Sequence, residues 1–309
     1  MRNILSYYYN LYPDNILTDS DKYIFDYENK YYSFELYKRP LEDINNLYEL
    51  DTKLIENNIM MHEIIKNNNG DILTYVNLKP YILMEINVNK NAKIRLSEIC
   101  FINNNSIDIK KNNALLRTNW TNLWESKIDY FESQINEIGK KYPNLCNYAN
   151  YYIGLAENAI MYIKDVFSTD SYAFISVCHK RINSQKTYYE LYNPLSLVLD
   201  FRVRDACEYI KSCFFNDSDA YNALKEYFKM NYVSYKEALL LYGRLIYPSY
   251  FFDLYDDIVN LNLDENKIEN IVIKSEEYEK FLVDTYIYLS KLYNRYIPRI
   301  DWLLKKSHN

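Results

Sequence analysis

Glycine and histidine are scarce in this chain. Only four glycines and three histidines occur among its 309 residues. Neither a G-x-G-x-x-G fingerprint nor a P-loop is present, so the sequence lacks a glycine-rich cradle for phosphates. The histidines, His62, His179 and His308, are too few for a metal site with histidine ligands, and no G-x-S-x-G elbow occurs. These absences argue against a P-loop enzyme, a histidine-ligated metalloenzyme and a serine hydrolase.

Other absences bear on the compartment and on the partners. The five cysteines lie far apart and form no C-x-x-C pair, which indicates buried free thiols in a reducing compartment. The net charge of −6 gives no basic field that would attract nucleic acid. No apolar run is long enough to span a membrane, and the N-terminus lacks the features of a signal peptide. We therefore expect no transmembrane segment, and a protein that is cytoplasmic or attached to other structures by protein contacts.

What the chain has in abundance is tyrosine, with 36 residues spread along its whole length. This even spread indicates a bias toward AT-rich codons rather than an aromatic binding site. Hydrophobic residues make up 49% of the chain and charged residues 25%, which is typical of a globular protein. The length allows two modest domains or one large bilobed one.

The first part of the chain predicts a small antiparallel sheet with one helix. Residues 21–38 alternate as two strands around a turn at residues 28–30, with Tyr32, Phe34 and Leu36 expected on a buried face and Ser33, Glu35 and Tyr37 on a wetter one. Residues 41–58 have helical spacing. The Asn69-Gly70 pair predicts a hairpin turn between two further strands. We place this β-rich N-lobe at residues 1–88, with a hinge near residues 85–91.

Residues 89–309 predict a larger, mainly helical C-lobe. The segments 118–143 and 148–167 have the apolar periodicity of two long helices. A capping box at Ser234 and an acidic first turn after Ser275 predict two more helices. The polar tract 102–113 predicts an exposed loop between helices.

The stretch 174–215 carries the candidate chemistry. It predicts an apolar strand ending at His179, a polar loop, a hairpin returning to Asp200, and a helix with Asp205 and Glu208. Strand, histidine loop, hairpin and aspartate follow one another in this order in the phosphoryl-transfer sites of kinase-like enzymes. The predicted fold class is therefore α+β, a bilobed protein-kinase-like or phosphotransferase-like fold.

The residues in the working positions of such a site are mostly of the wrong type. Arg181 stands where the catalytic base is expected, and an arginine cannot accept a proton at physiological pH. Lys186 stands where an asparagine would hold metal. Only Asp200, at the magnesium position, has the right chemistry. The strand lysine that pairs with phosphates falls at or near Glu35, with Lys38 as the nearest alternative.

Several of these side chains have a structural interpretation as well. His179 in this context more often organises a loop through hydrogen bonds than acts as an acid or base. Arg202, Arg204 and Lys211 near Asp200, Asp205 and Glu208 predict an ion-pair lattice between loop and helix, with an anion site as the alternative.

Three segments, LWESKIDYFESQI, YYIGLAENAIMYI and NPLSLVLDFRVRDACEYIKSCFF, resemble the YutH-type spore coat proteins, relatives of the CotS group in Firmicutes. Their fold is similar to that of aminoglycoside and choline phosphotransferases. The resemblance is best over residues 120–215 and implies a kinase-like fold with a coat-associated or otherwise non-catalytic role. Active relatives of the phosphotransferase group have His-Gly-Asp in the loop, where this chain has His179-Lys180-Arg181. Asp200 and Asp205 alone match in type.

We therefore expect a pseudokinase-like scaffold that binds other proteins, such as spore coat components, and resides in the cytoplasm or the spore coat. On this hypothesis no residue is catalytic, His179, Arg181 and Lys186 mark degenerate positions, and no cofactor is needed. One alternative is a small-molecule phosphotransferase with an atypical active site, which would hold ATP and magnesium through Asp200 and Lys38. The other is a nucleotide or anion sensor that binds through Lys180, Arg181 and Lys186 without turnover.

Overall fold

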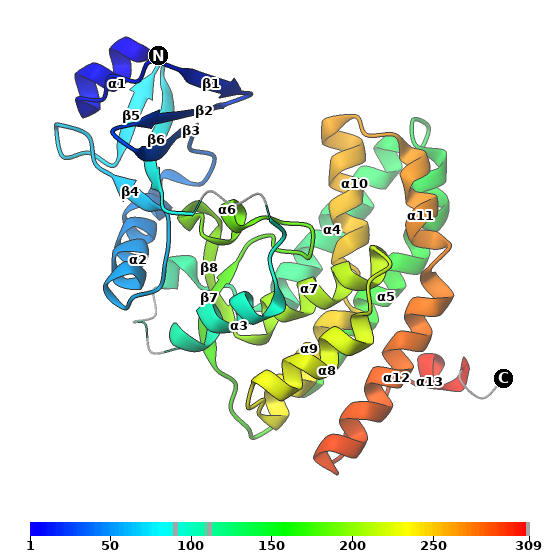
Figure 1. The fold of residues 1–309 in the computed structure, drawn as a ribbon. Helices are drawn as coiled ribbons and strands as arrows, with labels where there is room; N and C mark the ends of the chain where they lie inside the picture. Colours follow the sequence, from blue (N-terminus) through cyan, green and yellow to red (C-terminus); the bar gives the residue numbers. More distant parts are fainter. Residues whose placement is uncertain (89–91, 108, 110–112, 307–309) are drawn as a thin grey trace. The chain divides into compact units, whose positions relative to one another are not determined.

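The computed structural model describes residues 1–88, 92–107, 109 and 113–306. The chain divides into two compact units, coloured along the sequence in Figure 1. The first unit contains Met1–Leu116 and Ser176–Leu199, and the second contains Arg117–Ile175 and the chain from Asp200 onward. The predicted lobe boundary after residue 88 stays a prediction, and residues 92–107 and 176–199 belong to the same compact unit as the sheet. The predicted hinge begins inside a strand at Glu85 and ends on residues 89–91, which lie outside the described residues.

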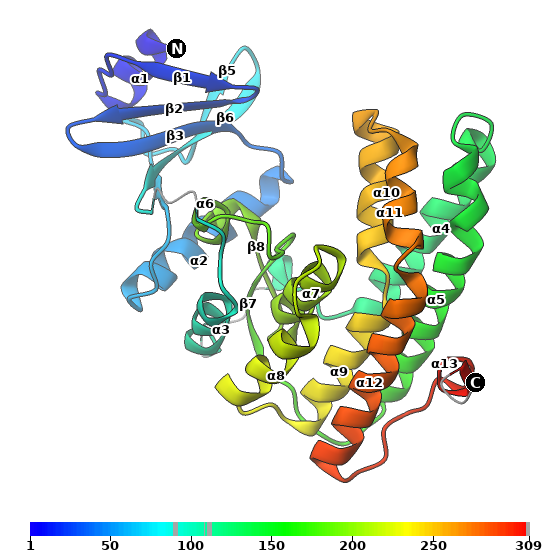
Figure 2. The same ribbon diagram turned by 45° about the vertical axis from the view of Figure 1, so that its right-hand side comes forward.

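An antiparallel sheet forms the centre of the first unit (Figure 2). Its strand order is β1 (Ile16–Asp19), β2 (Lys22–Tyr27), β3 (Lys30–Leu36), β6 (Lys79–Ile86) and β4 (Glu63–Ile65), and β5 (Leu73–Val76) also pairs with β6. The predicted hairpin between β2 and β3 is confirmed. Glu28 and Asn29 both have positive φ, at 50° and 62°, as the tightest two-residue hairpin turns require.

The hairpin predicted at Asn69-Gly70 is wrong, although a turn does occur there. Gly70 has a φ of +85°, and the Asn67 side chain accepts hydrogen bonds from the backbone N–H groups of Asn69 and Asp71, both at 3.0 Å. In the described part of the sheet, however, β4 and β5 pair with β6 and not with each other. The true hairpin joins β5 to β6 through Asn77 and Leu78, a turn without glycine that the sequence rules overlooked.

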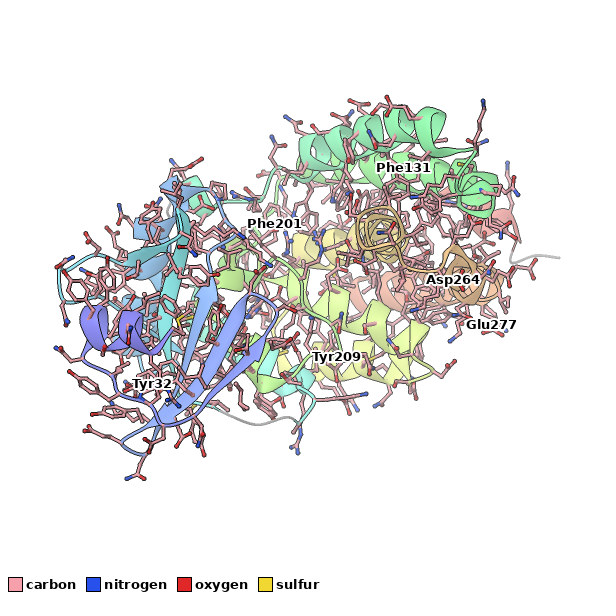
Figure 3. The ribbon with its side chains drawn as sticks, turned by 90° about the horizontal axis from the view of Figure 1, so that it is seen from above. Tyr32, Phe131, Phe201, Tyr209, Asp264 and Glu277 are labelled. Carbon is pink, nitrogen blue, oxygen red and sulfur yellow. The ribbon has the colours of Figure 1, made fainter. Side chains whose placement is uncertain are left out.

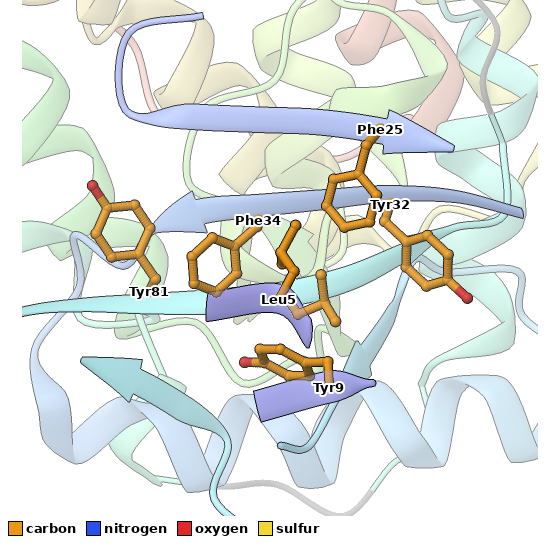
Figure 4. Close-up of a cluster of buried hydrophobic side chains, with 7 residues drawn as sticks. Leu5, Tyr9, Phe25, Tyr32, Phe34 and Tyr81 are labelled. Carbon is orange, nitrogen blue, oxygen red and sulfur yellow. The ribbon is translucent and has the colours of Figure 1, made fainter. Parts of the chain in front are cut away.

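One face of the sheet is covered by α1 (Arg2–Tyr9), a helix that the sequence analysis missed. Tyr32, labelled in Figure 3, belongs to an aromatic cluster beneath α1, and Figure 4 shows that cluster at close range. Its buried members are Leu5, Tyr9, Phe25, Tyr32, Phe34, Tyr81 and Leu83. Tyr9 of α1 meets the ring of Phe34 edge-on with centroids 6.0 Å apart, and Phe34 in turn stacks on Tyr81 at 5.0 Å, so aromatic packing holds the helix to the sheet.

The expectation of a wetter opposite face is wrong. Ser33 is fully buried and Tyr37 is only 4% exposed. This face is covered by a loop of the same unit, the one that follows β7. The Tyr189 hydroxyl of that loop lies 3.2 Å from the Ser33 hydroxyl. Both faces of β3 are therefore covered.

Three α-helices, three 3-10 turns and two strands complete the described part of the first unit or lead into the second. The helices are α2 (Ile44–Glu56), α3 (Leu96–Asn105) and α6 (Tyr188–Leu191), the 3-10 turns are Leu41–Asp43, Asn113–Leu115 and Pro194–Ser196, and the paired strands are β7 (Ile175–His179) and β8 (Leu197–Phe201). The exposed loop predicted at 102–113 is wrong for its first residues, because α3 continues to Asn105. Ile102 is fully buried there, and the Asn103 amide donates to the Val177 carbonyl at 2.7 Å. Residues 108 and 110–112 of that tract lie outside the described residues.

The second unit is helical, as predicted. Its helices are α4 (Trp120–Ile138), α5 (Pro143–Phe167), α7 (Val203–Phe215), α8 (Ala220–Met230), α9 (Tyr235–Ile246), α10 (Ser249–Leu261), α11 (Glu269–Val272), α12 (Ser275–Tyr293) and α13 (Asp301–Lys306). The predicted capping box is present, since Ser234 accepts from the Glu237 N–H at 3.2 Å. Gly243 of α9 lies so close to α5 that an added Cβ would stand 2.6 Å from Ile163 Cδ1.

Among the described helices, none combines the length and apolarity needed to cross a membrane.

Candidate functional site

Asp200, the magnesium position of the predicted site, is the fourth residue of β8 and belongs to the second unit. Its side chain is fully buried, and both carboxylate oxygens already accept hydrogen bonds. Trp120 Nε1 donates to Oδ1 at 2.8 Å and lies 3.1 Å from Oδ2, and the Phe201 backbone N–H donates to Oδ1 at 2.7 Å. Arg204, one helical turn on, donates to Oδ2 at 2.5 Å. A charge-assisted network of the protein's own donors therefore surrounds this carboxylate.

The orientation of Trp120 follows from packing at the start of α4. Its fully buried indole stacks on Trp124 with centroids 5.5 Å apart and meets the edge of Phe201 at 5.2 Å. The guanidinium of Arg244 lies 4.8 Å from the centroid of the same indole, within cation–π distance. With these contacts packed around the ring, the indole N–H is held toward Asp200. The apolar periodicity of residues 118–143 predicts the helix but gives no signal for this hydrogen bond.

Burial and two nearby cations have opposite effects on the pKa of the Asp200 carboxyl. Burial raises the pKa of the Asp200 carboxyl, whereas Arg204 and Arg244 lower it, and burial is the larger effect. In the described residues no group of three or more histidine, cysteine, aspartate or glutamate side chains could hold a metal ion. Magnesium coordination needs oxygens that are free to bind the ion. Here the oxygens face an indole N–H and a guanidinium, so this donor set does not fit a magnesium ion.

The predicted ion-pair lattice around α7 is present, with one change of partner. Glu208 accepts from Arg244 at 2.9 Å and lies 3.0 Å from Lys211 Nζ. Burial raises the pKa of Glu208, but Lys211 and Arg244 outweigh it and hold the pKa at about 2. Arg202, by contrast, pairs with Glu237 of α9 at 2.9 Å. Asp205 is fully buried in the first turn of α7. These contacts are internal to the second unit and link its helices.

His179, in the first unit, is placed as a loop organiser. It ends β7, is 1% exposed, and its Nε2 lies 2.8 Å from the carbonyl oxygen of Leu191 in α6. The next residue, Lys180, donates its backbone N–H to the Ser196 carbonyl at 2.7 Å. The imidazole therefore fixes the loop between β7 and β8 by a hydrogen bond to backbone.

The two cations of this loop differ in their surroundings. Arg181 has an exposed side chain whose Nη1 donates to the Lys180 carbonyl at 3.2 Å. Lys186 forms an ion pair with Glu190 at 2.5 Å, and Glu190 also completes a capping box with Thr187 at the start of α6. Burial raises the pKa of Glu190, but Lys186 and Thr187 outweigh it, so the pKa is lowered overall. The cation at the metal-asparagine position is thus paired within its own loop.

Glu35 of β3 lies at the centre of a second polar cluster, which we call the Glu35 cluster. Tyr189 of α6 donates its hydroxyl toward Glu35 Oε2 at 3.2 Å, and Asn193 donates its amide to Oε1 at 3.3 Å. Lys22 of β2, directly across the hairpin from Glu35, places Nζ 3.8 Å from Oε2 and 3.3 Å from the centroid of the Tyr189 ring. Side chains of the loop therefore cover this part of β3, where the sequence predicts the phosphate-pairing position.

Burial controls the ionisation of this cluster. It lowers the pKa of Lys22, against the opposing effect of Glu35, and burial and then Glu35 raise the pKa of the Tyr189 hydroxyl. His62, whose Nε2 lies 3.0 Å from the Tyr189 carbonyl, has its pKa lowered by burial to about 4. Tyr189 and His62 are therefore neutral at physiological pH.

Lys38, the predicted cofactor-binding lysine, lies beyond the end of β3. Its side chain is 68% exposed and pairs with Asp21 at 3.0 Å. The described contacts join Lys22, and not Lys38, to Glu35. The turn at residues 28–29 fixes the register that sets Lys22 opposite Glu35, so counting back from this turn could have identified it. Nothing in the sequence distinguishes Tyr189, as a residue that contacts Glu35, from the other tyrosines of the chain.

The fold is similar to that of solved phosphotransferases. An aminoglycoside phosphotransferase from Alicyclobacillus acidocaldarius subsp. acidocaldarius DSM 446 matches with a TM-score of 0.60 at 10% identity, covering 94% of this chain and 96% of that one. A spectinomycin phosphotransferase, solved in complex with ADP and spectinomycin, matches with a TM-score of 0.57 at 13% identity, covering 94% and 97%. At such low identity these matches show the fold alone. The predicted α+β, kinase-like fold with an antiparallel N-lobe sheet and a helical C-lobe is confirmed.

A curated relative is the endospore coat-associated protein YutH of Bacillus subtilis (strain 168). The two are 26% identical over an alignment of 210 positions, which covers 61% of this chain and 62% of the relative, so the match spans less than two thirds of the relative's length. The family model described as spore coat putative kinase YutH matches residues 2–285. The chain therefore belongs to the spore coat putative kinase YutH family, in agreement with the resemblance of its three segments.

Proposed function

We propose that this protein is a catalytically inactive member of the phosphotransferase fold that acts as a scaffold by binding other proteins. The state of Asp200 carries the proposal. Its oxygens are fully buried and accept from Trp120, Phe201 and Arg204, so a magnesium ion would have to displace a buried indole and a buried guanidinium. Removing one partner from a buried ion pair is strongly unfavourable. Magnesium-dependent nucleotide binding at this carboxylate is therefore disfavoured.

Three further positions support the same proposal. Arg181 cannot act as a general base, because the guanidinium stays protonated. Lys186, paired with Glu190, brings a positive charge to a position where an active enzyme needs a metal ligand. Glu35 brings a negative charge that would repel a triphosphate, and Tyr189 and Asn193 engage it. ATP and magnesium do not fit these side chains, so we propose no cofactor.

The spore coat is the proposed place of action. The Bacillus subtilis relative is described as endospore coat-associated. A layered coat is assembled from contacts between proteins, and a folded chain without a turnover site can contribute binding surfaces to it. Other coat proteins are accordingly the proposed partners.

A thermal-shift experiment with ATP tests the proposal. We expect the melting temperature to stay the same, within about a degree, when millimolar ATP is added with or without magnesium. A nucleotide present at a hundred times its Kd would stabilise the fold by about 2.7 kcal/mol and raise the melting temperature by several degrees. A solved aminoglycoside phosphotransferase, measured in parallel, serves as the positive control.

The alternatives give different results in the same experiment. A rise that requires magnesium, together with ATP hydrolysis that is lost in Asp200→Ala, would identify a phosphotransferase and contradict the proposal. A rise without magnesium that is lost in Arg181→Ala would identify a nucleotide sensor. Arg299→Ala, which changes a 61% exposed arginine outside both clusters, is the matched control for that loss.

A further inference from the structure

The strand β4, at one edge of the sheet, packs against α2 (Figures 1 and 2). Ile64 of β4 pairs with Met84 of β6 on one side, and its N–H donates to Asp51 Oδ2 of α2 at 3.1 Å. Asp51 is 2% exposed, and its Oδ1 has no hydrogen-bond partner in the described part of the chain. The Asp51 carboxyl thus joins α2 to the edge of the sheet.

The N-terminal end of α2 is held by a different kind of contact. Asp43, its N-cap, accepts from Arg39 Nη2 at 2.9 Å, and both side chains are 6% exposed. Arg39 also donates to the carbonyls of Leu195 and Leu197, at 3.1 and 2.7 Å. Because an aspartate and an arginine both stay charged across the neutral pH range, this anchor does not depend on pH there.

The Asp51 carboxyl, by contrast, has no opposite charge beside it. Glu63 of β4 repels its ionised form, and no cation among the described residues lies within ion-pair distance of it. The turns Asn113–Leu115 and Pro194–Ser196, which also pack against α2, carry no titratable side chain. Ionisation of Asp51 therefore places an uncompensated charge in a buried position. The other charged or titratable groups on α2 and on the elements packed against it are Glu42, Asp43, Tyr48, Glu49, Lys53, Glu56, His62 and Lys66.

We infer that Asp51 is a pH-controlled latch between α2 and the edge of β4. When its carboxyl ionises, residues 51–63 open in a fraction of the molecules, which hydrates the carboxylate and releases the Ile64 N–H. The ion pair of Arg39 with Asp43 keeps the first turn of α2 in place. The buried leucines of α2 favour the closed form, so the open form is a reversible minor state.

The latch opens as pH rises. Burial raises the pKa of Asp51 to about 7, with the Ile64 N–H opposing and Glu63 adding to the shift. Because an exposed aspartate has a pKa near 4, the closed form is fully favoured below that pH and is disfavoured as pH rises through about 7. His62 is not the cause of this change, since burial lowers its pKa to about 4. The latch involves neither of the two polar clusters, so it goes beyond the proposed function and does not depend on it.

Amide hydrogen exchange of the full chain between pH 6 and pH 8.5 tests the inference. Protection factors, corrected for the intrinsic exchange rate at each pH, report the opening equilibrium. We expect residues 51–64 to be less protected than residues 47–50 and than β3 at every pH. Their protection should be constant below about pH 7 and should fall by about tenfold for each pH unit above it.

Two variants separate the latch from other causes of opening. Asp51→Asn keeps an acceptor for the Ile64 N–H but stays neutral, so the protection of residues 51–64 should no longer change with pH. Glu63→Gln, at an exposed position, removes the neighbouring like charge and should move the onset of the loss to lower pH. Glu49→Gln, at an exposed glutamate of the same helix, is the matched control and should behave like the unchanged chain.

Two results would overturn the inference. Residues 51–64 that are as protected as β3 would open only together with the whole unit, and no latch would exist. A loss of protection above pH 7 that persists in Asp51→Asn would mean that another group controls the opening.

Discussion

The two polar clusters around the predicted positions Asp200 and Glu35 differ in how their carboxylates are paired. In the second unit, Asp200 is fully buried and paired with Arg204 at 2.5 Å. In the first unit, Glu35 keeps 15% of its side chain exposed, its cation Lys22 is 3.8 Å away, and its nearer partners are the neutral Tyr189 and Asn193. The Asp200 carboxylate is held by a buried ion pair in the helical unit, whereas the Glu35 carboxylate is held mainly by neutral donors of a loop and stays partly exposed.

This difference predicts how much stability the protein loses when each cluster is mutated. A buried charge that loses its partner costs several kcal/mol, since the remaining ion has no water to replace it. A hydrogen bond from a neutral donor to a partly exposed carboxylate contributes only about 1 kcal/mol, because water can replace the donor. Asp200 with Trp120 and Arg204, the Asp200 cluster, should therefore contribute strongly to the stability of the second unit. The Glu35 cluster should be dispensable for folding.

Asp200→Ala should have the largest effect. It leaves the Arg204 guanidinium, only 10% exposed, without its carboxylate and leaves the Trp120 N–H without its acceptor. We expect the free energy of unfolding to fall by about 3 to 5 kcal/mol, measured by urea denaturation. In an active enzyme the magnesium aspartate is a functional group, and its loss usually costs activity more than stability.

Asp217→Ala is the matched control for this measurement. Asp217 also pairs with a cation, Lys274 at 2.6 Å, but its side chain is 84% exposed. Such a surface pair contributes between zero and about 1 kcal/mol. If Asp200→Ala were as mild as Asp217→Ala, the Asp200 cluster would not be a structural ion pair, and the comparison between the clusters would fail.

Asp51 of α2 shows what a buried carboxylate does in the absence of a cation. It is 2% exposed, accepts from the Ile64 N–H at 3.1 Å, and its Oδ1 has no hydrogen-bond partner in the described residues. Burial raises its pKa to about 7, with the Ile64 N–H opposing and Glu63 adding to the shift. The folded state therefore binds a proton that the unfolded state releases near pH 4. Its contribution to stability is complete below that pH and is lost as pH rises through about 7.

Asp51→Asn should remove the loss of stability that occurs as pH rises through about 7. The amide keeps the shape and stays neutral, so at pH 8 the variant should be about 2 to 4 kcal/mol more stable than the unchanged chain, and the gain should vanish near pH 4. Urea denaturation at each pH measures both curves. His62 provides a check, because its pKa is lowered to about 4 and its contribution is lost as pH falls below 6.5 in both proteins. A gain that is constant with pH would mean that Asp51 does not titrate in this range.

Local patterns in the sequence predict much of the fold and part of the site. The strand ending at His179, the return to Asp200 and the helix that follows were all identified, because alternation and helical spacing act within a few residues. The ion pair of Asp200 with Arg204 was predicted, but its hydrogen bond from Trp120 was not, because the two residues are 80 positions apart and meet only in the folded chain. Likewise, Asn103 was assigned to a loop, yet a tertiary bond to Val177 keeps it in a helix. Side chains distant in sequence decided both cases.

Tyr189→Phe should have the smallest effect and gives the finest test of the comparison. The change removes one hydroxyl from the Glu35 cluster, while Lys22 and Asn193 still engage the carboxylate. We expect the free energy of unfolding to fall by about 1 kcal/mol by urea denaturation, with Tyr7→Phe, at a 74% exposed tyrosine, close to zero. A loss as large as that of Asp200→Ala would mean that both clusters hold up the fold equally. A loss near 1 kcal/mol would instead place the Glu35 cluster at the contact of the α6 loop with the sheet, where it covers β3 without being needed for folding.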